Sequence, residues 1–385
     1  MRRPVYIAGS GLLCARGDSP DAVAASLWAG DYQAGKRHLG ERGDSPDAVA
    51  ASLWAGNYQA GKRRLGEREF PYFPLHLAES DWMKRAEQAV RQVTSQLGPL
   101  AATTPLFIAS SSFQIGYFEQ QGEPFNLPAA NAEFSCQLAL WMHLDGPCSS
   151  FSSACISGFS AIEAARSLIA TGQIDEAVII GLELTNNVTL AGFAAMELLS
   201  RTTSRPFDKN RDGLVLGEAV AAIRLSATPS NWHIAGLCTG IDAYSTTGPD
   251  PDGGPIASVT VDCLKEAHFL PGDIELIKVQ AAGSPGTDLA EANALKKVFG
   301  EKIPPLLSLK PALGHTLGAS GIAELATLLA CLAADQIPAT AGYSEADPEI
   351  GPVLPVDRNK CHVNRAMLNL IGFGGGLATM IIERV

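Results

Sequence analysis

Short apolar runs alternate along this chain with longer stretches in which apolar residues recur at helical spacing. The run at 176–181 lacks polar alternation, which is typical of a strand buried on both faces. The stretch 159–170 places apolar residues at helical intervals with small residues between them, which predicts a buried helix. Strands that alternate with helices predict an α/β protein with mainly parallel strands.

This pattern runs twice along the chain. The first series also has predicted strands and helices at 5–13, 75–98, 105–109, 131–144 and 219–225. A polar stretch at 227–231 then precedes a second series, predicted at 233–237, 259–268, 274–279, 288–298, 306–308, 315–334, 366–371 and 377–382. The helix at 315–334 matches the one at 159–170 in its small residues and its place in the series. The sequence therefore predicts two similar halves, residues 1–227 and 228–385.

A tandem repeat interrupts the first series. Residues 16–41 are followed at once by a near copy, 42–67, and the copies differ only at Asp31 against Asn57 and His38 against Arg64. So few differences indicate a recent duplication or an artefact of the recorded sequence. Each copy encodes one short helix with a serine N-cap and a proline at its first position. We expect one copy to pack on the core and the other to be peripheral, so that Trp28 and Trp54 differ in burial.

The composition is that of a globular protein with much buried surface. Of the 385 residues, 46% are apolar and 18% are charged, enough for two core-bearing units or one large layered assembly. The net charge of −11 argues against nucleic acid as the main partner. The basic residues at 36–37 and 62–64 form either a solvated face or a docking patch for an acidic partner.

Three further features favour a cytoplasmic enzyme without a membrane partner. No apolar run is as long as a transmembrane helix. The first residues read as a strand and lack the apolar region of a signal peptide. The eight cysteines are scattered without a C-x-x-C pair or zinc-ligand spacing, which indicates reduced thiols. We expect neither a metal ion nor a cofactor.

Cys155 stands out among these cysteines. It lies in the small-residue stretch 152–158, where a strand, a sharp turn and the buried helix are predicted to follow one another. Unpaired N–H groups and the helix dipole favour a thiolate at such a helix N-terminus. A buried structural cysteine is the more common role of a free thiol. Both readings stay open from this stretch alone.

Four features occur together in a fixed order: the Cys155 elbow, an Arg-Pro-Phe-Asp segment at 205–213 followed by Gly-Glu, the segment 310–315, and a glycine turn around Phe373. In this order and spacing they resemble the β-ketoacyl-acyl carrier protein synthases of the thiolase-like superfamily. The resemblance covers nearly the whole chain apart from the extra repeat copy. It implies a layered αβαβα fold made of two pseudo-duplicated halves with mainly parallel sheets.

The resemblance also implies roles for matching residues. Cys155 matches the nucleophile that takes an acyl chain from acyl carrier protein as a thioester. His315 matches the second active-site histidine, which holds the malonyl thioester oxygen during decarboxylation, and Lys310 matches the lysine beside it. The backbone N–H groups of Cys155 and Phe373 match the oxyanion hole.

One family residue is replaced. The family's first histidine opens a segment that here reads Gln-Ala-Ala-Gly-Ser-Pro from Gln280, and Asp288 and Glu291 keep the register. The glycine turn also departs, with Gly376 and Leu377 where the family has threonine and asparagine. Loss of one such hydrogen-bond donor costs roughly 100- to 1000-fold in rate. A glutamine amide donates a hydrogen bond but exchanges no proton near neutral pH.

Three classes of function therefore compete. The first is the chain length factor partner in a heterodimeric ketosynthase of a type II polyketide or aryl polyene system, which Gln280 favours and the retained Cys155 and Lys310 oppose. The second is a competent homodimeric condensing enzyme, or a relative that transfers acyl groups without decarboxylation. The third is a binding protein on this fold. The sequence does not identify the acyl chain that is held. Phe113, Phe118 and Met196 line either an acyl tunnel or the core.

Overall fold

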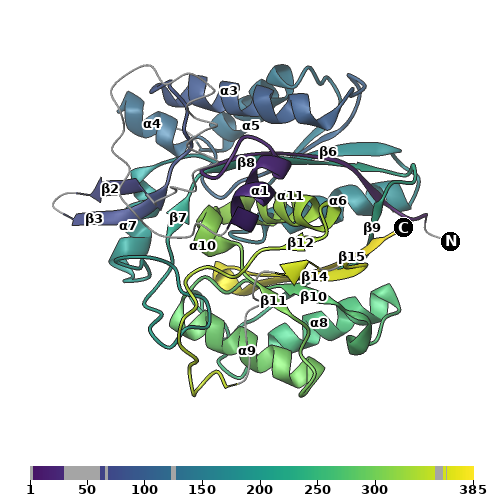
Figure 1. The fold of residues 1–385 in the computed structure, drawn as a ribbon. Coiled ribbons are helices and arrows are strands. Elements are labelled where there is room, and N and C mark those ends of the chain that lie inside the picture. The colour runs from purple at the N-terminus through teal and green to yellow at the C-terminus, as the bar shows by residue number, and fades with distance from the viewer. Residues whose placement is uncertain (1–2, 30–60, 66–67, 123–126, 352–358, 361) are drawn as a thin grey trace.

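The computed structural model describes all residues except 1–2, 30–60, 66–67, 123–126, 352–358 and 361. Helices and sheets stack in five layers (Figure 1). Helices α3 (Trp82–Thr94), α4 (Ile115–Gln121) and α5 (Leu127–Trp141) cover one outer face, and α8 (Gly254–Ala267) and α9 (Pro285–Phe299) cover the other. The layered α/β fold predicted from the sequence is confirmed.

The strands form two groups of five with the same topology. The first group has the order β5 (Cys148–Phe151), β4 (Leu106–Ala109), β6 (Glu176–Glu183), β8 (Ala219–Ser226) and β1 (Tyr6–Cys14). The second has the order β11 (Leu306–Leu307), β10 (Leu276–Lys278), β14 (Arg365–Ile371), β15 (Gly376–Arg384) and β9 (Trp232–Ile241). A single pairing of Tyr6 with His233 joins the groups.

Strand direction follows the same rule in both groups. The outer three strands pair in parallel, and the inner strands pair antiparallel. The apolar pattern predicts burial but does not distinguish direction, because helices cover both faces of every sheet. The repeated strand order supports two similar halves, whose boundary at 227/228 stays a prediction.

Two buried helices form the central layer. They are α6 (Ser157–Ala170) and α11 (Ser320–Ala333), one from each half. They approach closely because each has a glycine at the contact: a Cβ on Gly321 would lie 2.7 Å from Cδ1 of Phe159, and one on Gly158 would lie 3.1 Å from Ile322. Each helix follows one of the predicted catalytic residues, so the central layer brings Cys155 and His315 to the same end of the molecule.

Shorter elements complete the fold. These are α7 (Asn187–Ala195), α10 (Lys310–Leu313), β12 (Gln336–Ile337), β13 (Asn359–Lys360) and the 3₁₀ turns η1 (Ser95–Leu97), η2 (Pro271–Asp273), η3 (Leu317–Ala319) and η4 (Phe373–Gly375). Helix α3 lies within the range 75–98 that is expected from the sequence to hold a helix, and Asp81 caps its N-terminus by accepting from the backbone N–H of Lys84.

In the described residues, one repeat copy contributes a helix and the other a strand. The first copy supplies α1 (Pro20–Ala29), whose Val23 and Leu27 are buried in the core that also includes α11, while Trp28 is half-buried. The second copy supplies β2 (Gly61–Leu65), which pairs antiparallel with β3 (Arg68–Phe73), and β3 in turn pairs with β7 (Leu216–Gly217). One copy thus packs on the core as expected. Trp54 lies outside the described residues, so the comparison with Trp28 stays a prediction.

Candidate active site

Cys155 lies on a tight turn between β5 and α6. The preceding Ala154 has a φ of 49°, a left-handed conformation that costs energy for a residue other than glycine. Local hydrogen bonds hold it: the Ser157 hydroxyl donates to the carbonyl of Ala154 at 2.6 Å and accepts from the backbone N–H of Ser153 at 2.9 Å. The turn places the thiol beside the first turn of α6, as the sequence predicts.

The environment of the Cys155 thiol opposes its ionisation. Burial raises the pKa of Cys155 to about 11, and the charge of Lys310 and a hydrogen bond from the backbone N–H of Phe373 lower it by less. The helix N-terminus therefore does not make Cys155 a resting thiolate, contrary to the expectation from its position. Desolvation is the larger effect because the thiol is only about 5% exposed.

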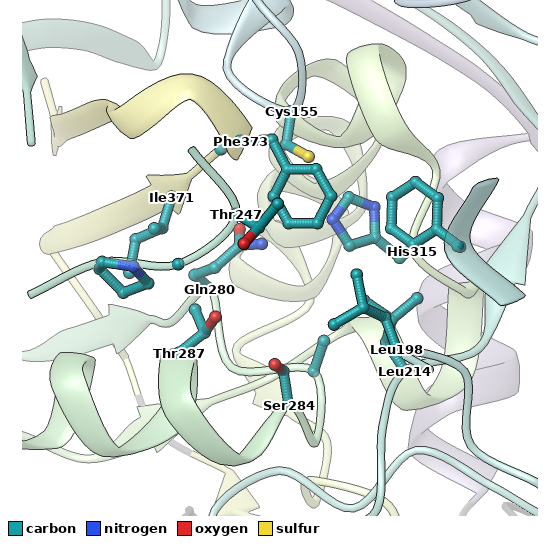
Figure 2. A pocket seen from close by; sticks show the side chains of 15 residues that line it. Cys155, Leu198, Leu214, Thr247, Gln280, Ser284, Thr287, His315, Ile371 and Phe373 are labelled. Atoms are coloured by element: carbon teal, nitrogen blue, oxygen red, sulfur yellow. The ribbon is translucent and has the colours of Figure 1, made fainter. Parts of the chain in front are cut away.

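His315 lies across the pocket from Cys155 (Figure 2). Backbone hydrogen bonds with Val215 and Gly217 fix its position between α10 and η3. Its Nδ1 accepts from the backbone N–H of Leu317 at 3.0 Å, so the proton of the neutral ring is on Nε2. Burial and then Lys310 lower the pKa of His315 to about 3. The ring is neutral at physiological pH and is a hydrogen-bond donor through Nε2.

Gln280 follows β10 and points into the same pocket (Figure 2). Its backbone N–H and that of Ala281 donate to the carboxylate of Glu291 at 2.9 and 2.8 Å. The Gln280 side chain is buried, and its Oε1 has no hydrogen-bond partner. The structure thus places the replaced residue beside Cys155 and His315, with an unpaired amide oxygen.

The glycine turn packs directly on the Cys155 backbone. A Cβ on Gly372 would lie 3.2 Å from the backbone nitrogen of Cys155. Gly375 has a φ of 76°, and a Cβ there would lie 1.8 Å from the carbonyl oxygen of Asp242, so only glycine fits. The turn holds the N–H of Phe373 against the thiol, and the Phe373 ring stacks on Phe193 with 5.4 Å between ring centroids.

Lys310 lies below the pocket and does not line it. It is buried, and its Nζ contacts Glu324 at 2.5 Å. The other carboxylate oxygen of Glu324 contacts Nζ of Lys278, also at 2.5 Å. Lys310 therefore acts on Cys155 and His315 through its charge, as both pKa shifts indicate.

The pocket is narrow. Its cavity volume is about 40 Å³, room for roughly three water molecules. It is lined by Cys155, Phe193, Leu198, Leu214, Thr247, Gly248, Pro249, Gln280, Ala282, Ser284, Thr287, His315, Ile371, Gly372 and Phe373. An acyl chain on the thiol therefore requires side-chain movement.

Comparisons with known proteins identify the family. Residues 92–229 match the family model described as β-ketoacyl synthase, N-terminal domain, and residues 233–344 match the corresponding C-terminal domain. The 3-oxoacyl-[acyl-carrier-protein] synthase 2 of Coxiella burnetii is 31% identical over 283 residues, 68% of each chain. The chain belongs to the β-ketoacyl synthase family. The tetracenomycin ketoacyl synthase alpha subunit of Streptomyces glaucescens is also 31% identical, over 65% of this chain and 63% of its own.

Solved ketosynthases share the fold over the whole chain. A ketosynthase in complex with its chain length factor from Xenorhabdus doucetiae matches with a TM-score of 0.83 at 22% identity, covering 100% of this chain and 98% of its own. A β-ketoacyl synthase from Burkholderia phymatum matches with a TM-score of 0.78 at 24% identity, covering both chains fully. At these identities the likeness concerns the fold, which is that of the thiolase-like ketosynthases.

In this ketosynthase-family chain the 205–213 segment is structural. The carboxylate of Asp208 accepts hydrogen bonds from the backbone and hydroxyl of Ser344. The backbone N–H of Phe207 donates to Asp288 at 2.9 Å, and that of Gly213 donates to the carbonyl of Gly283 at 2.9 Å. The segment braces the backbone that follows Gln280 and does not line the pocket.

Sequence reasoning missed several pocket residues. Phe193, Leu198 and Thr247 line the pocket, although no motif marks them. Phe113 is buried in the core around α3 and α5, and Met196 is 41% exposed; neither is among the lining residues, nor is Phe118. The missed residues are distant from Cys155 in the sequence, so the residue spacing around Cys155 does not predict that they line its pocket.

In the described part of the chain, every helix is too short or too polar to cross a membrane. The seven cysteines described there are free thiols.

Proposed function

We propose that this chain is a ketosynthase-family subunit that accepts an acyl group on Cys155 from acyl carrier protein and condenses weakly or not at all alone. It acts as the chain length factor partner of a complete ketosynthase, in the cytoplasm and without a metal ion or cofactor. The observation that carries the proposal is Gln280 in the pocket beside Cys155 and His315. The acyl-holding groups are present, and one of the two imidazole donors for decarboxylation is replaced.

Acyl transfer needs only groups that are present. The sulfur of Cys155 attacks the thioester carbonyl, and the backbone N–H groups of Cys155 and Phe373 stabilise the tetrahedral oxyanion. The carrier's thiol leaves and takes up the proton that Cys155 loses. His315 is not the base, because its Nδ1 is engaged by Leu317 and its Nε2 carries a proton.

Condensation would be slow. Decarboxylation of a malonyl thioester builds negative charge on the thioester oxygen. At the positions that the family's two histidines occupy, the pocket offers the Nε2–H of His315 and the amide of Gln280. An amide in place of an imidazole costs up to roughly 100- to 1000-fold in rate.

An exposed sheet edge supports assembly with a second subunit. β5 is the last strand of its group, and its residues from Cys148 to Ser150 are exposed. Beside it on α5, Leu140 is 64% exposed. Among the described residues the outer edge of β5 has no strand partner, and an open strand edge next to an exposed leucine suits docking of another sheet edge. The solved complex of a ketosynthase with its chain length factor matches this fold.

A basic hairpin supports contact with an acidic carrier protein. Arg63, Arg64 and Arg68 lie on β2 and β3. The guanidinium of Arg63 lies over the ring of Tyr72 and donates to Asn187 at 2.7 Å. Asn187 begins α7, the helix that carries Phe193 into the pocket wall. We assign the hairpin as the carrier docking surface.

The alternative is a competent homodimeric β-ketoacyl-acyl carrier protein synthase. Retention of Cys155, His315 and Lys310 favours it, and relatives described as 3-oxoacyl-[acyl-carrier-protein] synthase 2 predominate among those compared.

Release of carbon dioxide from malonyl-acyl carrier protein separates the two. The chain is assayed alone and together with a complete ketosynthase of the same organism, and acylation of Cys155 is followed by intact mass. We expect acylation and a stable complex, but little carbon dioxide from the chain alone. Robust decarboxylation by the lone homodimer would contradict the proposal. Gln280→His should raise the rate only partly, because Ala281, Ala282 and Gly376 also depart from the family pattern.

A further inference from the structure

Lys278 is a fully buried lysine that the chemistry above does not use. It lies on β10, two residues before Gln280. Residues two positions apart along an extended strand have side chains on the same face. Its Nζ contacts Glu324 at 2.5 Å and donates to the carbonyl of Asn369 at 2.9 Å. A buried ammonium is costly unless it is paired, so its presence below the pocket needs a reason.

The contacts of Lys278 join the two sides of the pocket. On one side, Glu291 accepts hydrogen bonds from the backbone N–H of Gln280 and, at 3.4 Å, from the side-chain amide of Asn369. The backbone carbonyl of Asn369 in turn accepts from Lys278. On the other side, Glu324 pairs with both Lys278 and Lys310. A continuous buried network therefore runs from Gln280 to Lys310.

Charge balance in this network depends on Lys278. The two lysines face the carboxylates of Glu324 and Glu291, so the four groups sum to zero when all are ionised. Lys310, Glu183 and Glu324 act on Cys155: Lys310 lowers the pKa of the thiol, and both glutamates raise it. Without Lys278, Lys310 alone would balance Glu324 and Glu291, and the network would carry one excess negative charge.

We propose that Lys278 is a positioning residue for the thiol chemistry of Cys155. It neutralises Glu324 and ties the Gln280 segment to the Lys310 segment, so that an anion can form in the pocket. The assignment rests on the proposed acyl transfer at Cys155. Lys278 does not touch the reacting atoms; it acts through Glu324 and Lys310.

The test measures how fast methyl methanethiosulfonate, a small thiolate-specific reagent, modifies Cys155 in the full chain, by mass spectrometry of the Cys155 peptide at several pH values. At pH 7 Lys278, whose pKa burial lowers to about 8, is still protonated. We expect Lys278→Met to slow the modification at pH 7 roughly fivefold and to shift its pH profile upward. Lys302→Met, which removes an exposed charge, is the control and should leave the rate unchanged.

A second variant separates charge from structure. Lys278→Met with Glu324→Gln removes one charge of each sign, and we expect the modification rate to return to within about twofold of the original. A double variant slower than Lys278→Met, or an unchanged rate in Lys278→Met, would overturn the proposal. Protection of buried Cys331 reports folding in each sample, and loss of that protection in both variants would assign Lys278 a purely structural role.

The reagent needs neither carrier protein nor partner. Failure of acyl carrier protein to acylate Cys155 would therefore count against the proposed function and leave this result standing.

Discussion

At Cys155 two physical effects oppose each other, and burial is the larger. The helix N-terminus and Lys310 favour the thiolate, yet the pKa of the thiol is about 11. A resting thiol is compatible with acyl transfer, because the leaving carrier thiol takes up the proton. His315 contributes a fixed N–H and not a base. The pocket is thus suited to holding a thioester and stabilising an oxyanion.

Gly375 offers a single-residue test of the turn that carries Phe373. Gly375→Ala places a Cβ against the carbonyl oxygen of Asp242, so we expect a loss of about 3 kcal/mol in the free energy of unfolding and slower acylation of Cys155. Gly374→Ala is the matched control: its φ of 75° is equally positive, but no atom lies within 4 Å of the added Cβ. It should cost about 1 kcal/mol. Equal losses in urea unfolding would show that steric contact with Asp242 is unimportant.

At the scale of elements, the described residues of the two repeat copies contribute one helix and one strand. The helix of the first copy packs on the core, and the strand of the second pairs with β3. Residues 20–29 and 61–65 correspond to different parts of the repeat, so a single copy contains the sequence of both elements.

Deletion of residues 42–67 tests this division. The shortened chain keeps α1 and brings residues 35–39 to the place that Gly61–Leu65 holds, separated from Arg68 by two residues, with His38 in place of Arg64. We expect the free energy of unfolding in urea to change by less than about 1 kcal/mol, since loop length alters closure entropy only slowly. In the shortened chain Leu27→Asp should cost about 3 kcal/mol, because it buries a charge beside α11. An unfolded deletion product would mean that the fold needs both copies.

At the scale of the whole molecule, the two halves meet in the central layer. Corresponding strand orders place α6 and α11 back to back, and each helix begins beside one reactive side chain. The pocket therefore exists only where the halves join. Among the described residues, the outer edge of β5 is exposed and is the surface proposed for assembly with a second subunit.

Leu140→Asp tests that edge. A charge beside β5 should prevent assembly with a second subunit, measured by light scattering after gel filtration, while unfolding of the single chain stays unchanged within about 0.5 kcal/mol. Leu270→Asp is the control, because Leu270 is equally apolar and 73% exposed but lies on the second half. Intact assembly in the Leu140 variant would place the interface elsewhere.

Many structural features of this protein can be predicted from short stretches of its sequence. The elbow at Cys155, the buried helices that follow Cys155 and His315, and the substitution at Gln280 depend on spacing and residue type over a few turns of chain. The repeated series of strands and helices indicates two halves for the same reason. Helix boundaries are less well predicted, since α3 occupies only part of the range 75–98 and α9 begins at Pro285 and not at the expected position 288.

Properties that depend on the residues packed around a side chain are set only by the tertiary structure. Desolvation, which needs neighbours from both halves, sets the pKa of Cys155 against the effect of its own helix. Phe193 on α7 and Thr247 reach the pocket from distant parts of the sequence, and Lys278 on β10 pairs with Glu324 on α11. Strand direction is likewise absent from an apolar pattern that is the same for parallel and antiparallel neighbours. Residue spacing specifies each element, whereas burial and charge balance arise only when the elements pack.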